Sequence, residues 1–106
     1  MKLNSESFTL SIIIPCFNEI NTIDEVIKKV KNTSIKSKQI IIIDDCSTDG
    51  TREYLGSLED KSIIVIFAEK NQGKGAAISK GFELATGEIS IIQDADLEYD
   101  PDEYQK

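Results

Sequence analysis

The chain of 106 residues contains no histidine and no tryptophan, and its only cysteines are Cys16 and Cys46. Without histidine, these residues cannot build a Ser-His-Asp or Cys-His nucleophile, or a histidine-ligated zinc site. Two cysteines are too few for a disulfide framework or a four-cysteine metal site, so we expect both to be reduced residues that fill the core. The chemistry must therefore come from carboxylates, lysine, hydroxyl groups and the backbone.

Long apolar runs and an excess of basic charge are also missing. No run approaches the roughly 18 apolar residues that span a bilayer, and residues 1–9 are polar and lack the apolar stretch of a signal peptide. We therefore expect a cytoplasmic location, or a place at the cytoplasmic face of a membrane in a longer protein. The 19 acidic residues outnumber the 12 basic ones and give a net charge of −7, which disfavours binding to nucleic acid or to anionic membranes.

Short apolar runs rich in isoleucine and valine predict strands at residues 10–14, 40–43, 63–67 and 89–92. The runs are continuous rather than alternating, which is typical of strands buried on both faces of a parallel sheet. Segments with helical patterns lie between them. The order predicts an α/β fold, an open, doubly wound, mostly parallel, Rossmann-like sheet with the arrangement βαβαβαβ and right-handed crossovers.

Three helices are expected between the strands, and the first has the clearest pattern. Apolar residues in the range 23–30 recur at the helical spacing, and Thr22 with Glu25 has the pattern of a capping box at its start. A weaker pattern covers residues 49–58. The third helix is expected at about residues 74–86, with Gly87 as its C′ residue. Its predicted apolar face consists of Ile78, Phe82 and Ala85.

Polar segments follow each predicted strand, at residues 15–19, 44–50, 69–75 and 94–98. In doubly wound sheets, ligands bind outside the carboxyl ends of the strands, at the point where the strand order reverses. The sequence therefore predicts one ligand site to which all of these segments contribute.

Asp94 and Asp96 follow the last predicted strand with one residue between them. In extended backbone, residues i and i+2 point the same way, so both carboxylates can face one site, and Glu98 has the same parity. Carboxylate oxygens suit Mg²⁺ or Mn²⁺. A solvated loop or a helix N-cap is the alternative, but the position after a buried strand favours a metal site with Asp94, Asp96 and Glu98 as ligands.

Asp44 and Asp45 end the second predicted strand. One of the two can cap the following helix, together with residues 47–49. The other is free to accept hydrogen bonds from a nucleobase or from a ribose hydroxyl, as acidic residues at strand ends do in dinucleotide folds.

Lys74 lies between Gly73 and Gly75 at the start of the third predicted helix. Glycines there allow close approach of the backbone, and a helix N-terminus with a nearby cation favours a diphosphate. A flexible loop with a solvated lysine is the alternative. The segment is not a Walker A loop, because no glycine lies five residues before Gly73 and no serine or threonine follows Lys74. It is not a dinucleotide fingerprint either, because Ile78 occupies the position of the third glycine.

Pro15, Phe17 and Glu19 follow the first predicted strand. Pro15 lacks a backbone donor and is expected to end the strand and turn the chain outward. Phe17 can cover a base or cap the core, and Glu19 is either solvated or a polar contact to the same ligand.

Five stretches, taken together and in this order, resemble the N-terminal half of a family 2 glycosyltransferase, the inverting class with the GT-A fold. They are residues 11–19 (SIIIPCFNE), 43–51 (IDDCSTDGT), 71–78 (NQGKGAAI), 85–88 (ATGE) and 93–98 (QDADLE). The resemblance covers about residues 10–102. The subgroup that the chain most resembles is the dolichyl- or polyprenyl-phosphate sugar synthases.

This resemblance implies a set of residues that bind the nucleotide sugar: Pro15, Phe17, Glu19, Asp44, Asp45, Lys74 and Asp94. Asp45 would hydrogen-bond the base, Lys74 would lie near the diphosphate, and Asp94 would contact the ribose or a metal ion. Asp96 would be the direct ligand of Mg²⁺ or Mn²⁺, whereas Glu98 stands where the subgroup usually has glutamine. Asp44, with Ser47, would shape the turn.

The implied reaction transfers a sugar from a UDP- or GDP-sugar to an acceptor, with inversion; a lipid phosphate, a glycan and another hydroxyl remain open as acceptors. Family members continue past the position of Lys106 into an acceptor-binding half that usually carries the catalytic base. We therefore expect residues 1–9 to be a tail and residues 10–106 to be the nucleotide-diphospho-sugar-binding part of a GT-A domain, with the acceptor half absent. No catalytic base is nominated.

Two other functions fit parts of the pattern. The first is a catalytically inactive nucleotide-binding module, favoured by the expected absence of the acceptor half. The second is a receiver-type phosphoacceptor domain, which also has a doubly wound sheet and an acidic pair. The acidic pair of a receiver follows its first strand, however, whereas Asp44 and Asp45 follow the second predicted strand.

Overall fold

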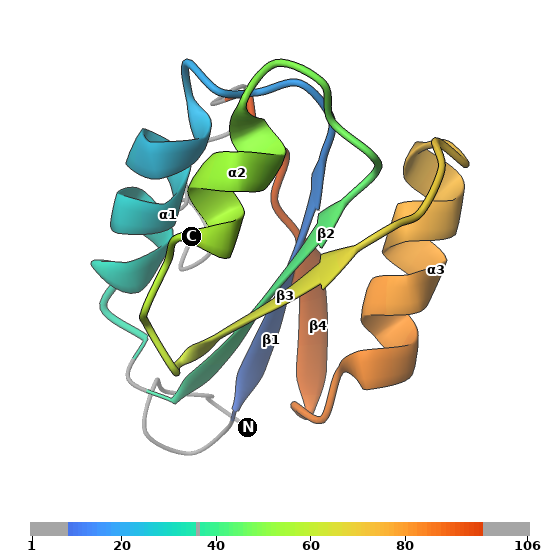
Figure 1. The fold of residues 1–106 in the computed structure, drawn as a ribbon. Coiled ribbons are helices and arrows are strands. Elements are labelled where there is room, and N and C mark those ends of the chain that lie inside the picture. Colours follow the sequence, from blue (N-terminus) through green and yellow to red (C-terminus); the bar gives the residue numbers. More distant parts are fainter. Residues whose placement is uncertain (1–8, 36, 97–106) are drawn as a thin grey trace.

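The computed structural model describes residues 9–35 and 37–96, which form a parallel sheet with helices on both faces (Figure 1). The elements of this part are β1 (Leu10–Cys16), α1 (Ile23–Lys31), β2 (Lys38–Asp44), α2 (Thr51–Gly56), β3 (Ile63–Phe67), α3 (Lys74–Leu84) and β4 (Ile89–Ile92). The strands are ordered β3-β2-β1-β4, and every neighbouring pair is parallel. The predicted α/β class and the doubly wound sheet are confirmed.

Helices α1 and α2 lie on one face of the sheet and α3 lies on the other (Figure 1). Alternate side chains of the central strands therefore enter two different cores. Ile12 and Ile14 lie in the larger cluster, which includes the buried stripe of α1, whereas Ile41 and Ile43 pack with Ala77 of α3. Strand β1 is buried throughout and β2 over most of its length, while the edge strands β3 and β4 are partly exposed.

The strand order places a switch point between β1 and β4. The chain moves outward from β1 to β2 and β3, and the crossover through α3 then returns it to the other side of β1. Helix α1 follows β1 and helix α3 precedes β4, and the two helices lie on opposite faces of the sheet (Figure 1). The strand order therefore places a crevice outside the carboxyl ends of β1 and β4.

Strand β1 continues through Pro15 to Cys16, so the prediction that Pro15 ends the strand is wrong. Pro15 stays in parallel register with Ile43 of β2. Residues i and i+2 of a strand direct their backbone groups to the same side, and the carbonyl of Ile13 accepts the N–H of Gln93 on the β4 side, at 2.9 Å. The nitrogen of Pro15 thus faces past the end of β4, where the sheet loses no hydrogen bond.

Helix α1 carries the predicted buried stripe but lacks the predicted capping box between Thr22 and Glu25. Thr22 is the N-cap residue and makes no side-chain hydrogen bond to the helix backbone. Its hydroxyl instead donates to the carbonyl of Ala95 at 2.5 Å and lies 3.2 Å from a carboxylate oxygen of Glu19. A contact with a segment 73 residues away thus replaces the local cap.

Helix α2 is shorter than the predicted range of 49–58. Gly50 precedes it with a φ of 105°, a conformation that favours glycine. The carboxylate of Asp49 accepts the N–H of Thr51 at 3.0 Å, so neither Asp44 nor Asp45 caps this helix.

Helix α3 ends at Leu84, and the prediction that Gly87 is its C′ residue is wrong. Ala85 already has extended backbone, with a ψ of 130°. Gly87 has a different structural role, because a Cβ there would lie 2.6 Å from Oγ of Ser11 and 2.7 Å from the carbonyl oxygen of Thr9. A glycine is therefore needed where the chain enters β4 beside β1.

The buried face of α3 also differs from the predicted one. Ala77 and Gly81 are its buried residues, whereas Phe82 is 50% exposed. Gly81 lets the helix backbone approach the sheet so closely that a Cβ there would lie 2.4 Å from Cγ2 of Ile13. The small residues therefore face the strands, and the larger Phe82 lies outside the contact.

Candidate nucleotide-binding site

A pocket of about 400 Å³ lies at the carboxyl ends of β1, β2 and β4, where the strand order predicts a ligand site. It is lined by residues from the end of β1, from the loops after all four strands and from the start of α3: Pro15, Cys16, Phe17, Glu19, Asp45, Asn71, Gly73, Lys74, Ala77, Asp94, Ala95 and Asp96. The fold thus brings together the predicted residues of the first, second, third and fourth polar segments. Asp44 is not among the lining residues, and Glu98 lies outside the described residues.

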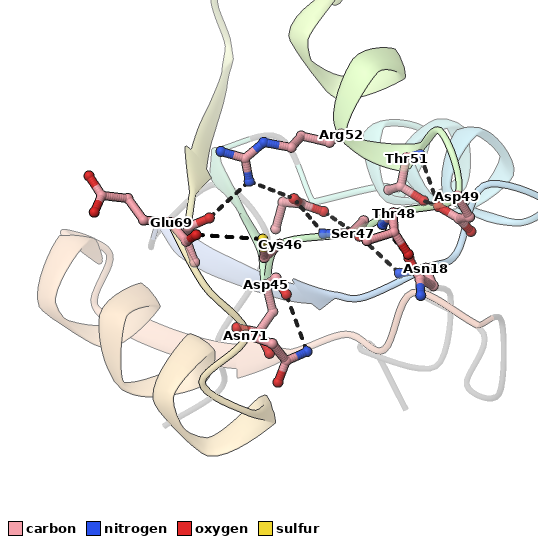
Figure 2. Close-up of polar contacts among 12 residues, drawn as sticks. Asn18, Asp45, Cys46, Ser47, Thr48, Asp49, Thr51, Arg52, Glu69 and Asn71 are labelled. Atoms are coloured by element: carbon pink, nitrogen blue, oxygen red, sulfur yellow. Dashed lines mark hydrogen bonds and ion pairs between the residues drawn. The ribbon is translucent and has the colours of Figure 1, made fainter.

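The loop after β1 is attached to the loop after β2 through Asn18 (Figure 2). Asn18 has a φ of 53°, a left-handed conformation that asparagine adopts more readily than most other residues. Its N–H donates to Oγ of Ser47 at 2.9 Å, and its side-chain oxygen accepts the N–H of Thr48 at 2.7 Å. These contacts fix the backbone next to Phe17, whose side chain is 45% exposed and lines the pocket.

The same two loops are joined again one residue later. The N–H of Glu19 donates to the hydroxyl of Thr51 at 3.1 Å, and the N–H of Ile20 donates to the carboxylate of Asp49 at 3.2 Å. Partial desolvation raises the pKa of Asp49, but the hydrogen bonds from Thr51 and Ile20 lower it below its usual value overall. The carboxylate of Asp49 therefore stays charged and keeps the two loops together.

Asp44 is fully buried and shapes the turn after β2. Its carboxylate accepts the hydroxyl of Ser47 at 2.6 Å and the N–H of Ser47 at 3.2 Å. Arg52 lies 3.4 Å from the same carboxylate, donates to the carbonyl of Ala68 at 2.9 Å, and stacks over the ring of Phe67 at 4.9 Å. These contacts agree with a role in the turn, and a direct role of Asp44 in binding the nucleotide stays a prediction.

The two cysteines have different environments. Cys16 is 3% exposed and belongs to the core, as predicted. Burial, followed by the nearby carboxylates of Asp44 and Glu19, raises its pKa to about 12. Cys46 is half-buried, has a φ of 64°, and its thiol lies 3.6 Å from the carbonyl of Glu69. The prediction that Cys46 fills the core is wrong, because it occupies the left-handed turn outside it.

Asp45 connects the end of β2 to the start of α3. Its side chain is 5% exposed, and its two carboxylate oxygens accept the backbone N–H groups of Gln72 and Gly73, each at 2.8 Å. The side chain of Asn71 lies 3.4 Å from the carbonyl of Asp45 (Figure 2). Gly73 has a φ of 96° and a ψ of 162°, a region that is open almost only to glycine.

Asp94 and Asp96 line the pocket on the side of β4, in a turn whose middle residue, Ala95, is held in place. Ala95 is 4% exposed, and its carbonyl accepts the hydroxyl of Thr22 at 2.5 Å. The ammonium group of Lys74 forms an ion pair with the carboxylate of Asp94, which is 17% exposed. The acidic pair and the first residue of α3 therefore meet across the pocket.

These residues fit a divalent ion only in part. Within residues 9–35 and 37–96, no three histidine, cysteine, aspartate or glutamate side chains come close enough to hold a metal ion together. Mg²⁺, however, is commonly held by one or two carboxylates, with water and substrate phosphate oxygens as the other ligands. Asp94 and Asp96 supply such a pair in one pocket, so their chemistry suits a metal ion that binds together with a diphosphate.

Sequence reasoning missed Asn18, Thr22 and Asn71 as residues that shape this site. An asparagine shortly after a strand is a signal for a left-handed turn, and this signal could have indicated Asn18, two residues after the end of β1. No local signal indicates the contacts of Thr22 with Ala95 or of Asn71 with Asp45, because the partners are 73 and 26 residues apart.

Residues 11–106 match the protein family described as Glycosyl transferase family 2. Among curated proteins, the chain is 42% identical over 90 residues to the cholesterol galactosyltransferase of Borreliella burgdorferi, a match that covers 84% of this chain and 25% of that protein. It is 33% identical over 95 residues to the dolichol-phosphate mannosyltransferase of Pyrococcus furiosus, which covers 88% of this chain and 27% of that protein. The chain thus spans about a quarter of the length of these relatives.

Among solved structures, the chain is similar to a mannosyltransferase of Pyrobaculum calidifontis in complex with GDP-Man and Mn²⁺. The TM-score is 0.74 and the identity 27%, and the match covers 84% of this chain and 28% of that one. The similarity in fold therefore extends over nearly all of the described sheet and its helices.

Proposed function

This chain belongs to glycosyl transferase family 2, and we propose that it binds the nucleotide-diphospho-sugar donor of a glycosyl transfer reaction. The observation that carries the proposal is the pocket at the carboxyl ends of β1, β2 and β4. It gathers an aromatic ring, a buried carboxylate, a lysine at a helix N-terminus and an Asp-x-Asp pair within about 400 Å³. The similar mannosyltransferase of Pyrobaculum calidifontis was solved with GDP-Man and Mn²⁺, which supports a nucleotide sugar and a divalent ion as ligands here.

We assign the base and ribose of the donor to the β1 and β2 side of the pocket. Phe17 is exposed at the rim, where its ring can stack on a base. Pro15 and Glu19 line the same side, and Glu19 offers a carboxylate to the ribose. Asp45 lies deeper, between this side and α3.

The diphosphate of the donor belongs beside α3 and the Asp-x-Asp pair. Lys74 and the N-terminus of α3 favour an anion, and Lys74 already lies beside Asp94. Asp94 and Asp96 would hold Mg²⁺ or Mn²⁺, which when bound neutralises charge on the diphosphate and on the departing nucleoside diphosphate. The net charge of −7 and the carboxylates that line the pocket favour such neutralisation when an anionic ligand binds.

In the proposed reaction, an acceptor oxygen attacks the anomeric carbon from the face opposite the diphosphate. The bond between this oxygen and the anomeric carbon forms, and the bond to the diphosphate breaks, so the nucleoside diphosphate leaves with the electron pair. A hydroxyl acceptor gives its proton to a base, which we place in the acceptor-binding part of the domain, whereas a phosphate acceptor attacks as an anion. The configuration is inverted. We propose that residues 10–106 form the donor-binding part of this domain, in accord with the share of the curated relatives that the chain spans.

The acceptor class is open between a lipid phosphate, a glycan and another hydroxyl. The names of two relatives contain a lipid, cholesterol in one and dolichol phosphate in the other, and these names support a lipid-linked acceptor. The described residues contain no helix with the length and apolar character needed to cross a bilayer. The cytoplasmic location stays a prediction.

The test is calorimetric titration of UDP and GDP with and without Mn²⁺. We expect removal of the metal to weaken binding by roughly tenfold or more, which is about 1.4 kcal/mol or greater. Asp96→Asn and Asp94→Asn should abolish this metal dependence, because an amide keeps the shape but loses the charge that holds a hard cation. Glu59→Gln is the matched control, since it removes one exposed carboxylate before β3, at the other end of the sheet.

Circular dichroism confirms that each variant is folded. Wild-type protein that binds neither nucleotide would refute the proposed function. If the affinity for UDP and GDP changes neither with Mn²⁺ nor with Asp94→Asn and Asp96→Asn, the metal site is refuted and an inactive nucleotide-binding module is favoured.

A further inference from the structure

Asp45 is placed to act on the diphosphate end of the pocket rather than on the base alone. Its two carboxylate oxygens accept the N–H groups of Gln72 and Gly73, which immediately precede Lys74 in the chain. This contact, the Asp45 cap, joins the end of β2 to the two residues directly before α3. Because both oxygens are engaged and the side chain is 5% exposed, the carboxylate is held in one orientation.

The backbone geometry of the loop depends on this cap. Gly73 has a φ of 96° and a ψ of 162°, a region that is open almost only to glycine. A Cβ on Gly73 would meet no atom within 4 Å, so the backbone conformation, and not a lack of space, requires the glycine. The hydrogen bonds from Gln72 and Gly73 to the carboxylate of Asp45, with the bond from Asn71 to the Asp45 carbonyl, attach this loop to the end of β2.

The cap is continuous with the acidic pair. Lys74 follows Gly73 directly, and its ammonium group pairs with Asp94 at the end of β4. The sequence of contacts therefore runs from β2 through the loop before α3 to the Asp-x-Asp turn, and it crosses the pocket.

We infer that Asp45 is a positioning residue that sets the place of Lys74 against the diphosphate, an inference that rests on the nucleotide-binding function proposed above. The inference separates two roles of one carboxylate. A contact with the base alone acts on the nucleoside, whereas the cap acts on the diphosphate through Lys74. If Asp45 contacts only the base, its substitution changes the affinity for nucleosides. If Asp45 acts through the cap, its substitution changes the affinity for ligands that contain a diphosphate.

Pyrophosphate with Mn²⁺ is the probe that separates them, because it contains no base. In Asp45→Asn the amide has one acceptor and one donor group, so one of the two backbone N–H groups loses its acceptor. We expect the affinity for pyrophosphate to fall about tenfold. Removing a negative charge near an anion should by Coulomb's law strengthen binding instead, so the expected loss has the opposite sign to the simple charge effect.

Two further variants make the measurement specific. Gly73→Ala leaves the charge of Asp45 in place but disfavours the backbone conformation of the loop, and it should reproduce the loss. In a Lys74→Ala background, Asp45→Asn should change the affinity for pyrophosphate by less than about twofold, because residues that act through one another are not additive. Glu59→Gln is again the charge control.

The affinity for UDP divided by the affinity for uridine measures how much the diphosphate adds to the binding of the nucleoside, and this ratio should fall in Asp45→Asn. Hydrogen exchange of the Gln72 and Gly73 amides in the ligand-free protein should become faster in that variant. If wild-type protein binds UDP or GDP while Asp45→Asn leaves the pyrophosphate affinity unchanged or tighter, Asp45 is not a positioning residue and the proposed function stands. If wild-type protein binds neither nucleotide, both proposals fail together.

Discussion

Replacing Gly81 with alanine tests the packing of α3 on the sheet, because two physical effects predict opposite results. Alanine is the better helix former and should stabilise a helix interior by up to about 1 kcal/mol. At position 81, however, the new Cβ would lie 2.4, 3.1 and 3.3 Å from three side-chain atoms of Ile13. Ile13 is fully buried in the central strand, so it has little room to move.

Overpacking of this kind costs about 1–3 kcal/mol. After subtraction of the gain in helix propensity, we expect Gly81→Ala to lower the free energy of unfolding by up to about 2 kcal/mol. Gly75 is the matched control on the same helix, because a Cβ there meets nothing within 4 Å. Gly75→Ala should therefore be neutral or stabilising by about 0.5 kcal/mol in this first turn.

Urea unfolding followed by circular dichroism measures both variants, with the midpoint compared at equal slope. At equal slope, the free energies of unfolding of the two variants should differ by about 0.5–2.5 kcal/mol, with Gly81→Ala the less stable. If Gly81→Ala is as stable as Gly75→Ala, the close approach of α3 to β1 is wrong, and so is the explanation of why Phe82 lies outside the contact.

Three further outcomes follow from individual contacts. Cys16 should react with iodoacetamide far more slowly than Cys46 in the folded protein at pH 8, because burial raises the pKa of Cys16 to about 12. A reaction of Cys16 as fast as that of Cys46, or faster, would contradict its place in the core. The ammonium group of Lys31 makes the largest contribution to lowering the pKa of Asp60 from 3.8 to about 2, and hydrogen bonds from Ser62 contribute next. Because the pKa of Asp60 is lower in the folded protein, its charged carboxylate stabilises the fold above about pH 4, and this stabilisation is lost as the pH falls through about 2. Asp60→Asn should therefore flatten the dependence of the free energy of unfolding in urea on pH between these values. The same pH dependence in wild type and variant would refute the ion pair. Thr22→Val should destabilise the protein by about 1 kcal/mol and weaken metal-dependent binding of UDP or GDP, because the turn of Asp94 and Asp96 loses its hydrogen bond from Thr22. Thr22→Ser keeps the hydroxyl and should retain both the stability and the binding of wild type. If Thr22→Ser behaves like Thr22→Val, the shape of the side chain matters and the hydrogen bond does not.

The sequence by itself determined the elements of the fold and the place of the site. Continuous isoleucine runs are typical of strands that are buried on both faces of a parallel sheet covered by helices, and the observed β2 and β4 fall on the predicted segments. The carboxyl ends of parallel strands meet at one edge, so the segments after them were expected to converge. Phe17, Asp45 and Lys74 do line a common pocket with the Asp-x-Asp pair.

Only the tertiary structure decided which partner each polar group has. Thr22 could cap its own helix, but the carbonyl of Ala95 competes successfully for its hydroxyl. Asp45 could contact a ligand, yet its two oxygens accept backbone N–H groups 27 and 28 residues away. Gly81 is recognisable as a contact residue only once Ile13 is placed beneath it. Local patterns indicate where strands and helices form, because φ and ψ depend largely on neighbours in the chain. Hydrogen-bond partners, close approaches and the burial of single residues such as Phe82 and Cys46 depend on residues that only the folded sheet brings together.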